Sequence, residues 1–321
     1  MSSLAKMFDP SLMFDRPITA LLTGSVVAAL IATSILVRVL HVLGKTSDKL
    51  HSELIARLRS WYLLSVCILA PILMGRMTTW FFLAVLSFLC LRELSKAVGL
   101  DRFRWALTGT IIANATIWFA VIEPWYGLFL AAVPLGIALI AVLELFQDQP
   151  AGYLKRVSLG ALALFLVGSS LGHLGWLSNQ DGYRSILMWI ILMTELNDVF
   201  AFTCGKTFGR RKLIPATSPN KTIGGAVGAL VLTTLLSIWV GSYVFAGTKL
   251  AEWHHLLVMG LMLSFFGQCG DLVMSSIKRD IGIKDMADTI PGHGGFLDRF
   301  DSLLITAPAL FYYMRLFGSV W

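Results

Sequence analysis

ITALLTGSVVAALIATSILVRVLHVL, residues 18–43, is the stretch that decides the fold. Arg38 is its only Asp, Glu, Lys or Arg residue. A helix that crosses a bilayer needs about 20 mostly apolar residues, because its backbone N–H and C=O groups must be satisfied inside the segment. This run is longer than the apolar core of a signal peptide, and no small-residue cleavage site follows it before Lys45. We therefore expect a retained membrane-spanning helix.

Apolar runs of this kind recur along the chain, which is 56% hydrophobic and 14% charged and has a mean hydropathy of +0.75. The other clear runs are 105–122, 125–146, 158–177, 185–204 and 223–245. Shorter or more polar runs, which a tilted or packed helix would accommodate, are 61–74, 78–91, 255–269 and 302–317. The pattern predicts an all-α polytopic membrane protein with about 9–10 transmembrane helices, and our count is ten.

The net charge of +7 is concentrated in alternate connections between these runs. Basic residues cluster at 45–59, 92–104, 155–156, 206–221 and 278–299. The intervening connections hold only Arg76, Arg184 and Lys249. The positive-inside rule places the first set on the cytoplasmic side. We therefore expect a multi-pass membrane protein with no nucleic-acid partner. The lack of a transit peptide and the length of 321 residues favour a bacterial inner membrane.

The two halves of the chain differ in where their polar residues lie. Up to about residue 190 the polar residues fall where helix ends are expected. In residues 194–222 and 268–301, by contrast, charged residues, Gly and Pro are concentrated beside the bilayer. We interpret residues 1–180 as N-terminal transmembrane helices and 181–321 as a catalytic transmembrane region. The active site is expected on the cytoplasmic side, built from the C-terminal half.

The first polar segment begins with TELNDVFAF, residues 194–202. Glu195, Asn197 and Asp198 fall inside an apolar run, where a carboxylate costs several kcal/mol unless it is paired, metal-bound or facing water. A functional pocket is favoured there over a structural pair with a basic partner.

The segment continues with glycines, basic residues and SPNKTIGG, residues 218–225. Ser218, Lys221 and Thr222 precede a predicted helix, and its first N–H groups are suited to binding phosphate. A Walker P-loop is excluded because its GxxxxGK[ST] spacing is absent. The prediction is a nucleotide cradle, and the alternatives are a topology determinant or a lipid head-group contact.

The second polar segment contains GQCGDLVMSSIKRD, residues 267–280, and PGHGGFLDRFD, residues 291–301. Asp271, Ser275 and Lys278 are spaced by four and three residues, which places them on one face of a helix. Hard oxygen ligands beside Lys and Arg suit phosphoryl-type transfer with one or two Mg²⁺ ions. The alternative is a set of surface salt bridges.

Residues 275–301 read Ser-x-Ile-Lys-Arg-x4-Lys-Asp-x-Ala-x2-Ile-Pro-x-His-Gly-Gly-Phe-x-Asp-Arg-Phe-Asp. This run resembles the signature of the phosphatidate cytidylyltransferase (CDP-diglyceride synthase) family at every defined position. The upstream segment from residue 194 is also similar, although Phe202 stands where the family commonly has Tyr. The first 180 residues add only membrane spans to the resemblance.

The resemblance implies a reaction in which CTP and phosphatidate give CDP-diacylglycerol and diphosphate. It implies that Asp271 and Asp298 hold a metal pair, one ion being Mg²⁺ and the second possibly an ion such as K⁺. The catalytic residues expected on this basis are Asp271, Asp298, Lys278, Ser275, Arg279 and His293. The residues expected to bind the nucleotide are Lys221, Ser218, Thr222, Asn197, Asp198 and Arg299. His293 is interpreted as a proton shuttle, a phosphate donor or a residue that shapes the turn.

Three other interpretations remain open at this point. One is a cytidylyltransferase paralogue that acts on another lipid phosphate. Another is a transporter with an ion site at Glu195, Asn197 and Asp198, which is disfavoured because the polar residues are confined to the C-terminal half. The last is an inactive scaffold, which is disfavoured because no residue of the long motif is lost. The family also suggests a homodimer.

Overall fold

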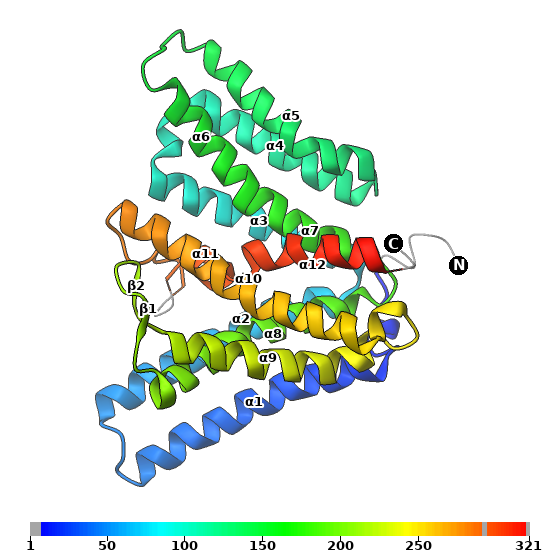
Figure 1. Ribbon diagram of the computed structural model, residues 1–321, viewed down its shortest axis with the longest axis vertical. Coiled ribbons are helices and arrows are strands. Elements are labelled where there is room, and N and C mark those ends of the chain that lie inside the picture. The colour runs from blue at the N-terminus through cyan, green and yellow to red at the C-terminus, as the bar shows by residue number, and fades with distance from the viewer. Residues whose placement is uncertain (1–7, 291–293, 319–321) are drawn as a thin grey trace.

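The computed structural model describes residues 8–290 and 294–318, and it is a bundle of long helices (Figure 1). His293 lies outside the described residues. The helices before residue 180 are α1 (Pro17–Val42), α2 (Asp48–Met74), α3 (Arg76–Val98), α4 (Arg104–Ile122), α5 (Tyr126–Leu145), α6 (Tyr153–Ala163) and α7 (Ser170–Leu177). Those after it are α8 (Tyr183–Phe208), α9 (Ile223–Val244), α10 (Trp253–Asp280), α11 (Leu297–Phe300) and α12 (Leu303–Phe317). A π-helical segment, Leu164–Ser169, joins α6 to α7.

The prediction of an all-α polytopic membrane protein is confirmed. Within the described residues, eight helices are long and apolar enough to cross a membrane: α1, α2, α4, α5, the continuous segment Tyr153–Leu177, α8, α9 and α10. The predicted runs 78–91 and 302–317 also form helices, α3 and α12, which are not among these eight. Charged residues occur near both ends of α3, and α12 has only 15 residues. The expected count of ten therefore corresponds to eight clear spans and two further helices.

A small sheet interrupts the helices between α8 and α9. Strands β1 (Lys212–Ile214) and β2 (Ser218–Thr222) pair antiparallel, with Lys212 opposite Thr222 and Ile214 opposite Ser218. The residue pattern indicated a polar connection between two apolar runs here, without strands. The hairpin leads directly into α9, and the Thr222 hydroxyl caps that helix by accepting a hydrogen bond from the Gly225 N–H at 3.1 Å. The prediction that Ser218, Lys221 and Thr222 precede a helix is therefore confirmed, and the nucleotide cradle stays a prediction.

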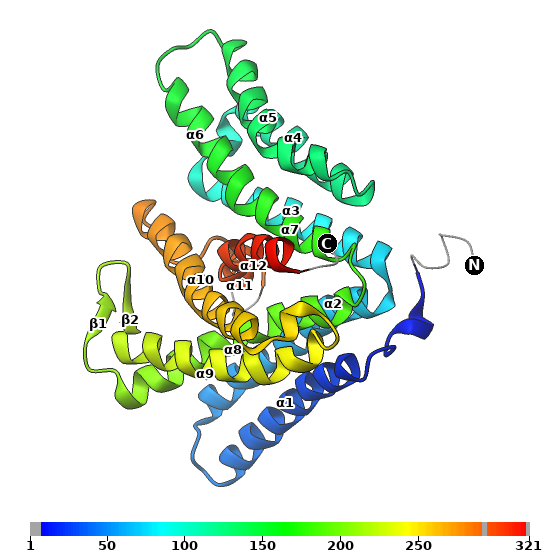
Figure 2. The same ribbon diagram turned by 45° about the vertical axis from the view of Figure 1, so that its right-hand side comes forward.

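The helices form a central group with two outer arms (Figures 1 and 2). Helices α4, α5 and α6 lie at one end of the longest axis, and α1 lies at the other. In the centre α10 packs against α9 and α12, while α12 also packs against α7, and α7 against α3. Fully buried side chains of this core include Leu171, Trp189 and Phe311. Helices from both sides of residue 180 thus build one core. The last polar segment lies between the end of α10 and the start of α12.

Candidate active site

A pocket of about 390 Å³ lies where the ends of α8 and α10 meet the hairpin, the start of α9 and α11. The structure brings together here eight residues predicted from sequence as site residues: Asp198, Ser218, Lys221, Thr222, Asp271, Lys278, Asp298 and Arg299. Asp285 and Asp301 line the pocket as well. Residues separated by about a hundred positions in the sequence therefore share one polar cavity beside membrane-spanning helices.

Asp271 links the hairpin to α10. Its carboxylate forms an ion pair with the ammonium group of Lys221, and the hydroxyl of Ser275 donates to its Oδ1 at 3.2 Å. Ser275 lies one turn further along α10, as the spacing predicted. The side chains of Lys221 and Asp271 are 20% and 24% exposed and line the pocket, although the Lys221 Nζ atom itself is buried.

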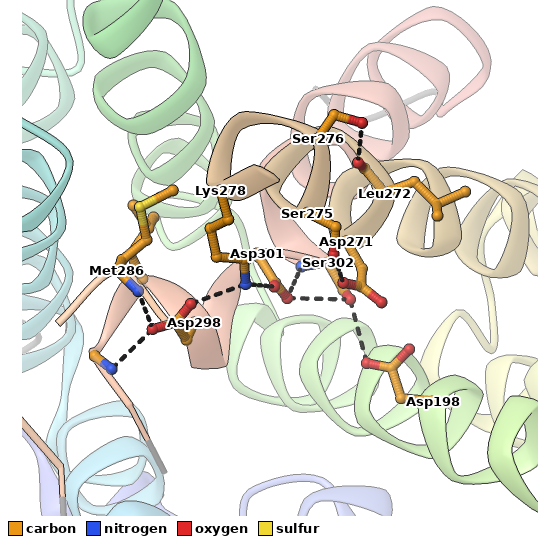
Figure 3. Close-up of polar contacts among 12 residues, drawn as sticks. Asp198, Asp271, Leu272, Ser275, Ser276, Lys278, Met286, Asp298, Asp301 and Ser302 are labelled. Carbon is orange, nitrogen blue, oxygen red and sulfur yellow. Dashed lines mark hydrogen bonds and ion pairs between the residues drawn. The ribbon is translucent and has the colours of Figure 1, made fainter. Parts of the chain in front are cut away.

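Lys278 connects two acidic residues of the last polar segment (Figure 3). Its ammonium group lies 2.9 Å from Oδ1 of Asp298 and 3.9 Å from Oδ2 of Asp301. Asp298 Oδ2 also accepts hydrogen bonds from the N–H groups of Met286 at 2.8 Å and Gly295 at 2.9 Å. Three protein donors thus hold Asp298, and its side chain is only 2% exposed.

Asp301 and Asp198 are joined through Ser302, which lies between them (Figure 3). The Ser302 N–H donates to Oδ1 of Asp301 at 2.8 Å, and its hydroxyl donates to Oδ2 of Asp198 at 3.2 Å. Burial and, secondly, the negative charge of Asp271 raise the pKa of the Asp301 carboxyl to about 8, although the Lys278 ammonium lowers it. The protonated, uncharged form of Asp301 is therefore favoured, and a cation bound beside the cluster would favour its ionised form.

Arg299 contributes a basic group that the protein does not fully use. Its Nε is buried and has no hydrogen-bond partner among the described residues. A buried guanidinium N–H without a partner is costly, and Arg is well suited to recognise phosphate oxygens. The pocket thus contains Lys221, Lys278 and Arg299 as three cationic groups.

Three predicted site residues lie beside the pocket rather than in its lining: Ser275, whose contact with Asp271 is given above, Asn197 and Arg279. Asn197 is fully buried, and its Oδ1 accepts hydrogen bonds from Thr233 at 3.1 Å and Ser264 at 2.6 Å, so it ties α8 to α9 and α10. Arg279 donates to the carbonyl oxygens of Thr217 at 3.4 Å and Ile283 at 3.1 Å. The roles expected for them from the resemblance stay predictions.

Sequence reasoning missed Glu93 of α3, which does not line the pocket but binds the segment that precedes Asp298. Its Oε1 accepts hydrogen bonds from the Thr289 hydroxyl at 2.6 Å and the Phe296 N–H at 3.1 Å, and its Oε2 accepts one from the Leu297 N–H at 2.9 Å. The signal was faint: a single acidic residue at the end of an apolar run, among basic neighbours.

The donor set is compatible with Mg²⁺, because carboxylate and hydroxyl oxygens are the ligands this ion prefers. No group of three His, Cys, Asp or Glu residues in the described ranges 8–290 and 294–318 is arranged to hold a metal ion alone. Mg²⁺ in phosphate-handling enzymes is usually bound by one or two carboxylates together with phosphate oxygens. The carboxylates that line the pocket therefore suit a cation that arrives with such a ligand.

Comparison with known proteins identifies the family to which the chain belongs. The model of the cytidylyltransferase family matches residues 55–317, which include every pocket residue described above. The chain belongs to the cytidylyltransferase family. It is therefore a nucleotidyltransferase enzyme, and neither the transporter nor the scaffold interpretation is retained.

Several relatives are similar over most of their length. The uncharacterized protein YnbB of Escherichia coli (strain K12) is 34% identical over 90% of this chain and 97% of its own. The phosphatidate cytidylyltransferase of Bacillus subtilis (strain 168) is 33% identical over 65% of this chain and 79% of its own. That of Staphylococcus saprophyticus is 30% identical over 77% and 94%, respectively. The cytidylyltransferase is thus an integral, multi-pass membrane protein with bacterial relatives.

Proposed function

We propose that this cytidylyltransferase transfers the cytidylyl group of CTP to phosphatidate, giving CDP-diacylglycerol and diphosphate, with Mg²⁺ as its cofactor. The observation that carries the proposal is the pocket in which Lys221, Lys278 and Arg299 face five carboxylates at the ends of membrane-spanning helices. The names of the relatives from Bacillus and Staphylococcus support phosphatidate as the acceptor. The basic connections support the cytoplasmic face of a bacterial inner membrane as the location.

The reaction forms one bond and breaks one. An oxygen of the lipid phosphate attacks the α-phosphorus of CTP, and the bond from that phosphorus to the α,β-bridging oxygen breaks. The electron pair of the broken bond leaves with diphosphate. Because the attacking phosphate monoester is already an anion, no strong general base is needed, and catalysis rests on positioning and charge neutralisation.

The residues of the pocket supply both. The ammonium groups of Lys221 and Lys278 and the guanidinium of Arg299 neutralise phosphate oxygens of the two substrates. Asp271 and Asp298 hold the two lysines in place, since each accepts an ion pair from one of them. The apolar helices around the pocket let the acyl chains of the lipid remain in the bilayer while CTP enters from water.

Asp271 and Asp298 remain the proposed Mg²⁺ ligands, and Asp271 is the more open of the two. A bound Mg²⁺ ion would neutralise charge on the phosphate oxygens and orient them. A second ion such as K⁺ and a homodimer stay predictions.

The test is an assay of purified protein in detergent with phosphatidate, radiolabelled CTP and Mg²⁺. We expect labelled CDP-lipid from the wild type and at least about 100-fold less from Asp271→Ala and Asp298→Ala. Asp181→Ala, which changes an exposed aspartate in the connection before α8, is the matched control and should retain wild-type activity. Equal activity in all variants would contradict the proposed site, and a wild type without product would contradict the reaction.

A second candidate is the same chemistry on another lipid phosphate. It is favoured by one observation: the match to YnbB covers 90% of this chain, whereas the matches to the two phosphatidate cytidylyltransferases cover 65% and 77%. A competition assay with phosphatidate, lysophosphatidate and a polyprenyl phosphate in the same micelles distinguishes the candidates. Phosphatidate should have the highest kcat/KM if our proposal holds.

A further inference from the structure

The segment that precedes Asp298 is fastened to α3, a helix of the N-terminal half. Glu93 receives three hydrogen bonds from this segment, one from the hydroxyl of Thr289 and two from the N–H groups of Phe296 and Leu297. The two N–H donors immediately precede Asp298 in the sequence. The contact therefore joins positions more than 190 residues apart, next to a central residue of the pocket.

The buried Glu93 carboxylate depends on these three hydrogen-bond donors for its stabilisation. It is only 7% exposed, and none of the ion pairs found between described residues includes it. A buried carboxylate is costly unless hydrogen bonds compensate the lost hydration, and bonds from N–H groups to an ionised oxygen are among the strong ones. The carboxylate and the segment consequently stabilise each other in one arrangement.

The glycines of the segment fit this arrangement closely. A Cβ on Gly295 would lie 2.5 Å from Oε2 of Glu93, so only glycine allows this close approach. Gly294 has a φ of +78°, and a Cβ there would lie 2.8 Å from Oδ2 of Asp298. One glycine thus makes room for Glu93 and the other for Asp298.

The same few residues then connect Glu93 to the pocket. Gly295, whose neighbour Phe296 donates to Glu93, itself donates to Oδ2 of Asp298. The other oxygen of Asp298 accepts the hydrogen bond from Lys278. A shift of residues 295–297 would therefore displace the Asp298 carboxylate and weaken its hold on the Lys278 ammonium.

We infer that Glu93 is a positioning residue, which holds the segment 294–298 so that Asp298 and Lys278 keep their places in the pocket. It touches neither the pocket nor a reacting group. The inference rests on the proposed function where activity is the readout, and a second readout below is independent of it.

The first test compares Glu93→Gln with Glu144→Gln. Gln keeps the size of the side chain but offers one acceptor oxygen in place of two, so the Leu297 or Phe296 N–H loses its partner. Glu144 is the matched control because it is equally buried in the N-terminal half and accepts a backbone N–H, from Ala106 at 2.7 Å, but lies on α5. We expect Glu93→Gln to lower kcat at least about tenfold with KM for CTP changed less than about threefold, since a displaced group near the reacting atoms mainly affects the transition state. Glu144→Gln should lower thermal stability at least as much and leave kcat of the folded fraction within about twofold.

A double-mutant cycle keeps the inference falsifiable if Glu93→Gln folds poorly. Gly295→Ala alone should lower kcat at least about tenfold, because the new methyl group displaces the Glu93 carboxylate. In a Glu93→Ala background the methyl group enters space that the carboxylate has left, so Gly295→Ala should then cost less than about twofold. Fully additive losses would overturn the inference.

Hydrogen exchange provides the readout that does not depend on the reaction. We expect the amides of Phe296 and Leu297 to exchange at least about tenfold faster in Glu93→Gln than in the wild type, and at the wild-type rate in Glu144→Gln. A wild type that makes no CDP-lipid would contradict the proposed function while this result still decides the role of Glu93. Exchange and kcat in Glu93→Gln that match those of Glu144→Gln would overturn the inference alone.

Discussion

Two buried clusters of charged residues in the described part of the chain differ in how completely the protein satisfies their ion pairs and hydrogen bonds. In the arm formed by α4, α5 and α6, Glu144 of α5 pairs with Arg156 of α6, and their side chains are 0% and 5% exposed. Arg156 also donates to the carbonyl oxygens of Ala151 and Gln149. Each charged group there is satisfied by the protein, and the cluster joins α5 to α6 and, through the Ala106 N–H, to α4.

The second cluster lies in the pocket and is not closed in this way. Its carboxylates outnumber its lysines, the side chains of Lys221 and Asp271 are partly exposed, and Arg299 keeps a buried N–H without a partner among the described residues. Capacity for further cations and anions is what a site for Mg²⁺ and phosphates requires. Incompletely satisfied ion pairs and hydrogen bonds, rather than burial, therefore separate the candidate catalytic cluster from the structural one.

The largest effect is expected from Lys278→Met, which removes the cation shared by Asp298 and Asp301. We expect CDP-lipid formation to fall about 1,000-fold, because a positioned charge near the reacting phosphates is lost. The measurement is kcat/KM with radiolabelled CTP, normalised to folded protein by size-exclusion chromatography. Near-normal activity would place Lys278 in the same structural class as Arg156.

Arg156→Met should show the opposite behaviour. Removing the guanidinium leaves the Glu144 carboxylate buried without its ion pair, which costs about 3–5 kcal/mol of folding free energy. The thermal unfolding midpoint in detergent should fall while kcat of the folded fraction stays unchanged. A specific loss of kcat with unchanged stability would erase the distinction between the two clusters.

Arg299→Gln sharpens the comparison within the pocket. We expect KM for CTP to rise about tenfold with a smaller change in kcat, since one charge-assisted contact to a phosphate is worth about 1.5–3 kcal/mol. Steady-state kinetics over a range of CTP concentrations measures both quantities. An unchanged KM would mean that its buried N–H does not serve the nucleotide.

Arg279→Gln should have the smallest effect, about threefold or less in kcat/KM, because Arg279 is occupied by the carbonyl groups of Thr217 and Ile283. The same assay serves. A loss of a hundredfold would instead support the catalytic role that the resemblance implied for this arginine.

Local sequence patterns predicted the helices and much of the candidate site. The apolar runs located the helices, and the spacing of Asp271, Ser275 and Lys278 placed them correctly on one face of α10. The hairpin was missed because its strands are three and five residues long and carry no alternating apolar pattern. Glu93 was missed because its partners lie about 200 residues away, and no local pattern encodes such a contact.

The measurement that tests the central claim most directly follows two labels of CTP through one reaction. With phosphatidate and Mg²⁺, CTP labelled at the α-phosphorus should transfer its label to lipid, and CTP labelled at the γ-phosphorus should release its label as diphosphate. When equal amounts of folded protein are compared, Lys278→Met should abolish both the transfer of the α-label to lipid and the release of the γ-label as diphosphate. Arg156→Met should change neither. Label from the γ-position in lipid, or no transfer by the folded wild type, would contradict the account.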